Sequence, residues 1–101
     1  MTLDLSCYAS DSLEEVTKTL ETIRKIHSGL FDERFLLSHV WAANSVHKEI
    51  AVEHGLKAEC LFLVTLNMQE FAELIPTVAF VLKNSFGPQK LIVLYQNDTL
   101  M

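Results

Sequence analysis

Apolar residues recur along the chain with two different periods, and these periods predict strands that alternate with helices. Over residues 3–8, the apolar Leu3, Leu5 and Cys7 alternate with Asp4, Ser6 and Tyr8, as in a strand with one solvated face near the edge of a sheet. Residues 60–64 and 91–94 are continuously apolar, which predicts strands covered on both faces. A short fourth strand is expected at about residues 34–37.

The first and third helices are predicted from apolar stripes that follow capping signals. Ser12 and Glu15 form a Ser-x-x-Glu capping box at the start of the first helix, and Gly29 is the natural residue to end it. Asn67 is expected to cap the third helix. Pro76 lacks the N–H that a helix interior needs, so we expect a kink or a break at the preceding residue.

A central helix is predicted from about His39 to His54, and we expect the rest of the chain to be arranged around it and the strand that follows. Ser38 can accept a backbone N–H at its start, and Gly55 can adopt the left-handed conformation that closes it. One side of this helix should pack on the sheet, through Ala43, Val46 and Ile50.

Trp41 and Val52 project from nearly the opposite side of the predicted central helix. One helix that packs on one sheet needs no second apolar stripe. These two side chains therefore lie either beneath a neighbouring helix of the same chain or against a partner protein. The second interpretation makes Trp41 and Val52 the candidate partner-binding residues.

The predicted elements follow one another in the order β-α-β-α-β-α-β. We expect a single α/β domain over residues 1–101, with three helices and a sheet of about four parallel or mixed strands, because helical connections favour right-handed crossovers between parallel strands. The side chains expected to be nearly fully buried are Leu20, Val46, Leu61, Leu63 and Ile92.

The charge balance argues against a nucleic-acid footprint. The 101 residues include 13 Asp and Glu against 8 Lys and Arg, which gives a formal net charge of −5. An acidic surface disfavours binding of nucleic acid or of an anionic membrane by this chain alone. The sequence carries neither a signal-peptide pattern nor an apolar stretch long enough to span a bilayer, so we expect a cytoplasmic protein.

The groups that could carry chemistry do not combine into a recognisable site. Cys7 and Cys60 fall in predicted strands without ligand spacing, so buried free thiols are expected. No nucleophile motif or phosphate loop is present, and the carboxylate pairs Glu14–Glu15 and Asp32–Glu33 lie at caps or turns. We therefore predict no catalytic residue, no enzyme activity and no cofactor.

Three histidines fall on one side of the predicted central helix, within about 80° of one another at 100° per residue. They are His39, His47 and His54. Two ligands for one metal ion on a helix need a spacing of three or four residues, whereas the last two of these histidines are seven residues apart. The sequence therefore predicts half-buried histidines and no metal site.

The stretch Phe31–Tyr95 resembles the PRPK-binding-protein family, the kinase-associated small subunit of the KEOPS (EKC) complex. The similar features are a short Ala-Ala-Asn run, a glycine after the central helix, a glutamate before an apolar strand, a polar turn, a helix segment and a Leu-Ile-Val strand. In this sequence they are Ala42-Ala43-Asn44, Gly55, Glu59 before Cys60–Val64, Asn67, Ala72–Leu74 and Leu91–Val93.

The resemblance implies a non-catalytic regulatory subunit that docks on a small atypical kinase, within a complex that makes threonylcarbamoyladenosine in tRNA. Some members of the family hold the 3′ end of tRNA. In this sequence the basic and polar link before the buried strand is short, and Lys57 is its one remaining basic residue. The third helix carries Pro76, and the chain stops at Met101 without the C-terminal helix common in the family. These departures weaken the expectation of tRNA contact more than that of kinase docking.

The alternative hypothesis is a homo-oligomeric ligand- or metal-binding module of ferredoxin-like type, similar to copper-tolerance or nitrogen-regulatory proteins. Residues 31–66 would then form two long strands of a hairpin, and strand extension would bury Trp41 between subunits. The helix-forming run Ala42–Ala51 and the glycine cap at Gly55 argue against this alternative. The sequence leaves the oligomeric state open.

Overall fold

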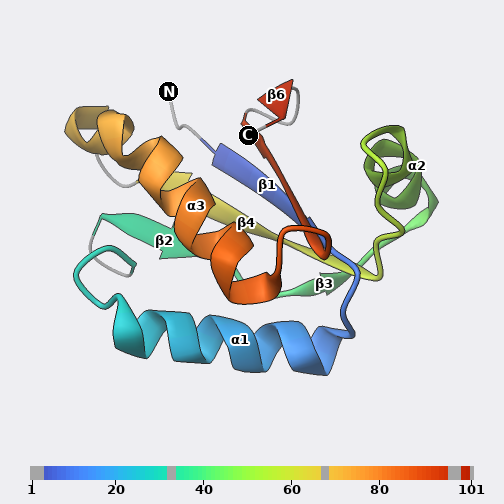
Figure 1. Cartoon of the computed structure of the whole chain (residues 1–101), viewed down its shortest axis with the longest axis horizontal. Helices are drawn as coiled ribbons and strands as arrows, with labels where there is room; N and C mark the ends of the chain where they lie inside the picture. Colours follow the sequence, from blue (N-terminus) through green and yellow to red (C-terminus); the bar gives the residue numbers. More distant parts are fainter. Residues whose placement is uncertain (1–3, 32–33, 67–68, 96–98, 101) are drawn as a thin grey trace.

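The computed structural model describes residues 4–31, 34–66, 69–95 and 99–100, which form one twisted sheet with helices packed on it (Figure 1). The elements are β1 (Asp4–Ala9), α1 (Leu13–Ile26), β2 (Phe35–Leu37), β3 (Trp41–Ala42), α2 (Ser45–Glu53), β4 (Cys60–Leu66), the 3-10 helix η1 (Gln69–Leu74), α3 (Ile75–Phe86), β5 (Leu91–Tyr95) and β6 (Thr99–Leu100).

The α/β class and the three α-helices are confirmed, but the prediction of parallel or mixed strands is wrong. The sheet order is β2-β4-β1-β5-β6, β3 also pairs with β4, and each of these ladders is antiparallel. The crossovers through α1 and α3 do join strands that run in the same direction. An antiparallel strand is inserted between the two strands of each crossover, which is the split β-α-β arrangement of ferredoxin-like folds.

Strand β1 lies at the centre of the sheet, which corrects the expectation of a half-solvated strand near its edge. It pairs with β4 along residues 4–9 and with β5 along residues 5–9. All its side chains except Asp4 are buried, including the polar Ser6. Both faces of β1 are therefore buried. The alternation in the sequence separates a face with apolar side chains from a face with polar ones, and it does not mark a solvated face.

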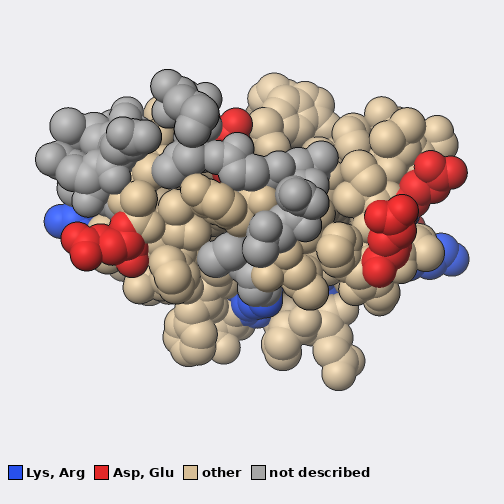
Figure 2. Space-filling view, turned by 90° about the horizontal axis from the view of Figure 1, so that it is seen from above, with Lys and Arg blue, Asp and Glu red and all other residues tan. Residues whose placement is uncertain are grey.

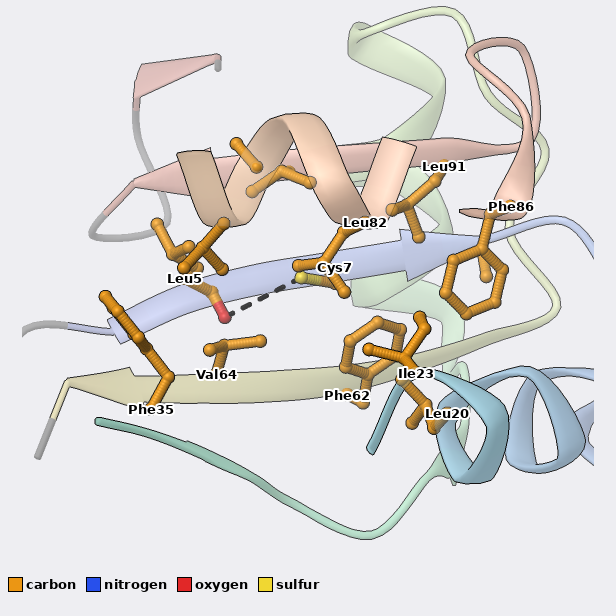
Figure 3. Packing of buried hydrophobic residues seen from close by; sticks show 14 of the residues in the cluster. Leu5, Cys7, Leu20, Ile23, Phe35, Phe62, Val64, Leu82, Phe86 and Leu91 are labelled. Atoms are coloured by element: carbon orange, nitrogen blue, oxygen red, sulfur yellow. Dashed lines mark hydrogen bonds between the residues drawn. The ribbon is translucent and has the colours of Figure 1, made fainter. Parts of the chain in front are cut away.

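The main core fills the space between one face of the sheet and helices α1 and α3 (Figures 1 and 3). The rings of Phe62 in β4 and Phe86 in α3 stack with centroids 5.8 Å apart. Leu20 of α1 packs into the same cluster, as predicted. On the opposite face, Leu61 and Ile92 are also buried as predicted, whereas Leu63 is only partly buried. Val46 is 58% exposed, so its predicted burial is wrong.

Helix α1 begins where predicted but ends early, and α3 begins at Ile75, later than the predicted start of the third helix after Asn67. The Ser12 hydroxyl accepts a hydrogen bond from the Glu15 N–H at 3.3 Å. Helix α1 ends at Ile26 with His27 as its C-cap, so Gly29 does not close it. Pro76 lies in the first turn of α3, directly after η1, where its missing N–H costs nothing. The predicted break is therefore confirmed, while the predicted cap at Asn67 lies outside the described residues.

The central helix starts six residues later than predicted, and Trp41 belongs to a strand. Helix α2 begins at Ser45 with Asn44 as its N-cap. The Ser38 hydroxyl, predicted as the cap, instead accepts the Leu63 N–H at 2.8 Å and so joins the β2–β3 link to β4. The predicted end is confirmed, because Gly55 has a φ of 82° and its N–H donates to the carbonyl of Val52.

The first prediction tests the main core. Phe62→Ala should lower the free energy of unfolding by about 3–5 kcal/mol, because it removes a fully buried ring that stacks on Phe86. Leu36→Ala, at a position that is 44% exposed on the neighbouring strand, should cost less than about 1 kcal/mol. Urea denaturation of both variants measures these losses. Equal losses would contradict this description of the core.

Candidate functional site

The second face of the sheet, hereafter the open face, is covered by α2 at one end, and α2 is the one α-helix in the described part of the chain that packs there. Tyr8, Leu61 and Ile92 lie opposite one another on adjacent strands and form a smaller cluster on this face. From α2, Ala51 is fully buried against this cluster and Ile50 is partly buried. In Figure 1, α2 stands at the right-hand end of the sheet, apart from α1 and α3.

Because α2 covers only part of the open face, a groove of ≈ 670 Å³ remains between the helix and the strands. The strands form its floor, β3 one wall and α2 the other. Among the described residues, no Asp, Glu, Lys or Arg lines it. The lining residues are Ser6, Tyr8, Leu61 and Leu63 on the floor, Trp41 and Ala42 on the β3 wall, and Asn44, Val46, His47 and Ile50 on the α2 wall.

Reciprocal hydrogen bonds fix the start of α2 and the imidazole in the groove wall. The side-chain oxygen of Asn44 accepts the His47 N–H at 2.9 Å, and the Asn44 N–H donates to Nδ1 of His47 at 3.2 Å. An accepting Nδ1 requires the neutral imidazole to carry its proton on Nε2. The ring centroid of His47 lies 6.3 Å from that of Tyr8, so the cap also sets the contact between α2 and the floor.

The structure separates the two predicted partner-binding residues. Trp41 pairs with Leu61 in the ladder between β3 and β4, so its side chain lies on the open face, where it is 38% exposed. His39 meets its ring in an edge contact with centroids 4.1 Å apart. Val52 is 62% exposed on the outer side of α2, beside Lys48 and Glu49, and does not line the groove. The predicted shared helix face is therefore wrong.

Sequence reasoning missed Tyr8 and the capping role of His47. Tyr8 was assigned to the solvated side of an edge strand, although it lies 2% exposed in the centre of the sheet. The spacing of Asn44 and His47 fits a capping pair, but histidine is not the usual partner in such a box. The Asn-x-x-His signal was therefore hidden by the stronger helix propensity of the preceding alanines.

The histidines do not form one cluster, because His39 lies outside α2. Only His47 and His54 remain on or next to this helix. Among the residues that the structure describes, no group of three or more His, Cys, Asp or Glu is placed to hold a metal ion. Within the same residues, no helix is long and apolar enough to cross a membrane.

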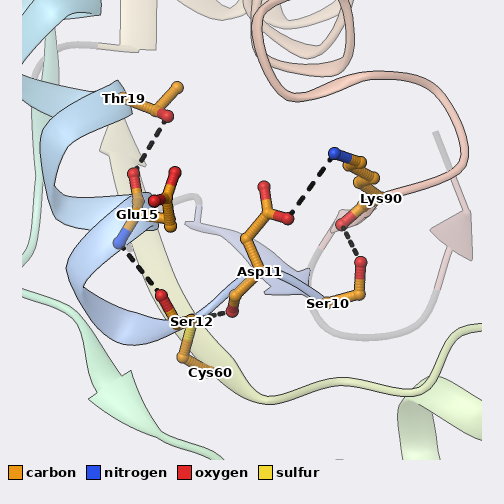
Figure 4. Close-up of polar contacts among 7 residues, drawn as sticks. All are labelled: Ser10, Asp11, Ser12, Glu15, Thr19, Cys60 and Lys90. Carbon is orange, nitrogen blue, oxygen red and sulfur yellow. Dashed lines mark hydrogen bonds and ion pairs between the residues drawn. The ribbon is translucent and has the colours of Figure 1, made fainter.

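Both cysteines are free and buried, as predicted. Burial raises the pKa of the Cys7 thiol far above its ordinary value. Burial also raises the pKa of Cys60 to about 11, and the nearby Asp11 and Glu59 carboxylates contribute to this shift. The Cys60 thiol donates to the carbonyl of Asp11 at 3.4 Å (Figure 4). Both thiols therefore stay protonated at neutral pH, where they are poor nucleophiles.

The polar contacts around Cys60 connect two turns of the fold and form no reaction centre. An ion pair of 3.7 Å joins Lys90 to Asp11, and the Ser10 hydroxyl donates to the carbonyl of Lys90 at 3.4 Å (Figure 4). The backbone N–H of Ser10 donates to the same carbonyl at 3.0 Å. The lysine side chain is largely exposed, so this ion pair contributes little to stability. These contacts hold the turn after β1 against the turn before β5.

Comparison with known proteins gives consistent results along nearly the whole chain. The family model described as "CDI System Immunity Component" matches residues 1–99. The chain is 43% identical over 98 residues to "Immunity protein CdiI-2" of Burkholderia pseudomallei (strain 1026b), covering 97% of each chain. It also resembles a chain of the "CdiA-CT/CdiI toxin and immunity complex from Burkholderia pseudomallei", with 42% identity, a TM-score of 0.94, and coverage of 97% of this chain and 95% of that chain.

These similarities contradict the resemblance to the PRPK-binding-protein family. Kinase docking, tRNA processing and a place in the KEOPS complex are therefore wrong for this chain. The features that suggested them, a capped helix and an apolar strand, are common to small α/β domains. The Ala42-Ala43-Asn44 run does not even lie inside a helix, since Ala42 belongs to β3 and Asn44 is a cap. The alternative module of ligand- or metal-binding type is also replaced, although its split β-α-β fold is the one found.

The second prediction concerns the wall of the groove. Helix α2 has nine residues, of which only Ala51 is fully buried, so its caps matter more than they would in a longer helix. Asn44→Ala should lower the free energy of unfolding by about 1 kcal/mol, since it leaves the His47 N–H without its acceptor. The matched variant Ser45→Ala, one residue further on, should be neutral. Urea denaturation measures the free energy of unfolding of both variants. An equal loss in the two would contradict the capping role of Asn44.

The third prediction concerns pH. The Cys60 pKa is about 11 in the folded chain against an ordinary value of 9.0, so its thiol stabilises the fold below pH 9 and that contribution is lost as the pH rises toward 11. The urea midpoint of the wild type should therefore fall more between pH 8 and pH 10.5 than that of Cys60→Ala. Parallel curves for the two proteins would show that this thiol is not protected from ionisation.

Proposed function

The chain belongs to the family of CDI system immunity components, and on this premise we propose that it binds the toxin domain of a CdiA protein and neutralises it. CDI denotes contact-dependent inhibition. Its function would then be to protect the cell that holds it, and we place this binding in the cytoplasm of that cell.

The observation that carries the proposal is the similarity to a chain of the toxin and immunity complex over 97% of this sequence. The relative from the same organism is named an immunity protein, so we infer that the matched chain is the immunity subunit. Because the similarity extends over 97% of this chain and 95% of that chain, we infer that the surface through which that subunit holds its partner has a counterpart here.

We propose that neutralisation occurs by binding and not by catalysis. The two thiols are protonated and inaccessible, and the groove is lined by apolar residues with only Ser6, Asn44, Tyr8 and His47 as polar groups. Such a lining suits recognition of a surface more than proton transfer. A protein that neutralises a toxin only while it stays bound must bind about one toxin molecule per chain, and it must bind tightly. A Kd near 1 nM corresponds to a binding free energy of about −12 kcal/mol.

The fourth prediction tests this function directly. Cells that express the CdiA toxin domain from the organism that encodes this chain should stop growing. Co-expression of this chain should restore their growth. The purified proteins should form a one-to-one complex in size-exclusion chromatography, with binding measured by titration calorimetry. The Phe62→Ala variant, which weakens the fold, should protect less. A folded wild-type chain that neither binds the toxin domain nor restores growth would contradict the proposal.

A further inference from the structure

Large apolar side chains are exposed on the helical side, on the outer side of α2 and on the open face, where Trp41 and Val46 line the groove. On the helical side, Ile26 of α1 and Phe80 of α3 are 69% and 66% exposed, beside shallow depressions of ≈ 300 and 260 Å³. On the open face, the groove at α2 has more than twice the volume of either. Trp41 and Val46 are exposed at its walls.

The groove continues into an apolar row that crosses the sheet. Leu63 on β4, Ser6 on β1, Leu94 on β5 and Leu100 on β6 lie opposite one another in consecutive ladders, so their side chains share the open face. Three of these four are leucines, and Leu100 is exposed at the far end. Leu36 is exposed on the same face, since it pairs with Thr65 of β4. Ser6 and Leu94 in the middle of this row are buried, so the exposed apolar side chains of the open face are Leu36, Leu100 and those of the groove walls. Exposed apolar side chains beside a groove are typical of an interaction site.

The walls of the groove are held in place by contacts within the chain. The ring of Trp41 is contacted by His39, and the start of α2 by the Asn44–His47 box. The end of α2 is closed by the N–H groups of Gly55 and Leu56, which donate to carbonyls of the last turn at 2.9 Å. A partner that enters this groove therefore loses little free energy in ordering the chain around it.

Carboxylates outnumber ammonium groups on the segments around the groove. Asp4 lies on the open face two residues before Ser6, because it pairs with Thr65. Glu49 and Glu53 follow Val46 and Ile50 by three residues on α2, so each borders a wall residue. Neither lines the groove itself, and both also line the depression on the outer side of α2 with Lys48 and Val52. Lys48 is the single cation on α2. Figure 2 shows acidic side chains gathered over the α2 end of the molecule, and the whole chain carries a net charge of −5.

From this geometry we propose that the groove is where the toxin domain is held, through a large apolar side chain that projects from a basic segment of the toxin. The apolar side chain enters between Trp41, Val46 and Leu63, and Lys or Arg residues beside it face Asp4, Glu49 and Glu53. This inference rests on the proposed function, because it takes the toxin domain as the partner. Aromatic and branched side chains in a dry pocket, surrounded by charged groups, are the usual arrangement of a tight interface.

The experiment compares two valines on the same helix. Val46 and Val52 are 58% and 62% exposed, but only Val46 lines the groove. Val46→Asp places a carboxylate in the groove wall without harm to α2, since an acidic residue is favourable in a first helical turn. It should raise the Kd for the toxin domain at least about 30-fold. Val52→Asp should change the Kd less than about threefold, and Phe80→Asp on the helical side should behave likewise.

The outcomes separate this inference from the proposed function. If the wild type binds and Val46→Asp binds equally well with an unchanged melting temperature, the groove assignment is overturned while the immunity function stands. Loss of binding in Val52→Asp or Phe80→Asp alone would move the interface to the outer side of α2 or to the helical side, and would also overturn it. If the wild type itself does not bind the toxin domain, the proposed function fails.

Salt and charge variants test the basic character of the toxin segment. Raising the ionic strength from about 0.01 M to about 1 M shortens the screening length from roughly 30 Å to 3 Å, so the association rate should fall steeply. The Glu49→Gln/Glu53→Gln double variant should associate several-fold more slowly than wild type at low salt and at the same rate at high salt. An unchanged or faster association rate of this variant at low salt would contradict the proposal that the toxin segment is basic.

Discussion

Strand β1 is the element on which the rest of the structure depends, because it is paired along both of its edges and buried on both of its faces. Its ladder with β5 joins segments that lie more than 80 residues apart in the chain, as between Tyr8 and Ile92, and its ladder with β4 joins Tyr8 to Leu61. On one face Leu5 and Cys7 meet the core under α1 and α3, and on the other Tyr8 meets α2. The two cores therefore share a single strand, and neither face can be rearranged without moving the other.

This central position explains why local patterns predicted the elements better than their arrangement. The buried strand over 60–64, the capped start of α1, the break before Pro76 and the glycine closure of α2 each depend on residues close in sequence, and all are found. Strand neighbours depend on distant segments. A helical crossover fixes that its two strands run in the same direction, but nothing in the crossover shows that an antiparallel strand will be inserted between them.

The groove illustrates the same limit at the level of function. Its apolar surplus could be read from the sequence, but the prediction placed Trp41 on a helix face, whereas Trp41 lies in strand β3. Its geometry could not, because the wall at Trp41 exists only through the register of β3 against β4. The error at Val52 has the same origin: with Trp41 moved from helix to strand, the two side chains no longer share a surface. The family could not be inferred either, since features common to small α/β domains do not distinguish one partner from another.

Helix α2 is an insertion within a β-hairpin, and this has a consequence for how such a protein can diversify. The Ala43 N–H donates to the carbonyl of Glu59 at 3.0 Å, directly beside the β3–β4 ladder, so the segment between them begins and ends at one point of the sheet. Its anchorage to the smaller core rests on Ala51, Leu56 and Ala58, with Ala43 and Ile50 partly buried. Most of its other positions are free to vary in sequence, and its length can vary too, because a surface loop with fixed ends tolerates such change at little cost. Changes in the sequence or length of this segment would therefore alter the α2 wall, and with it what the groove accepts, while the sheet beneath keeps its register.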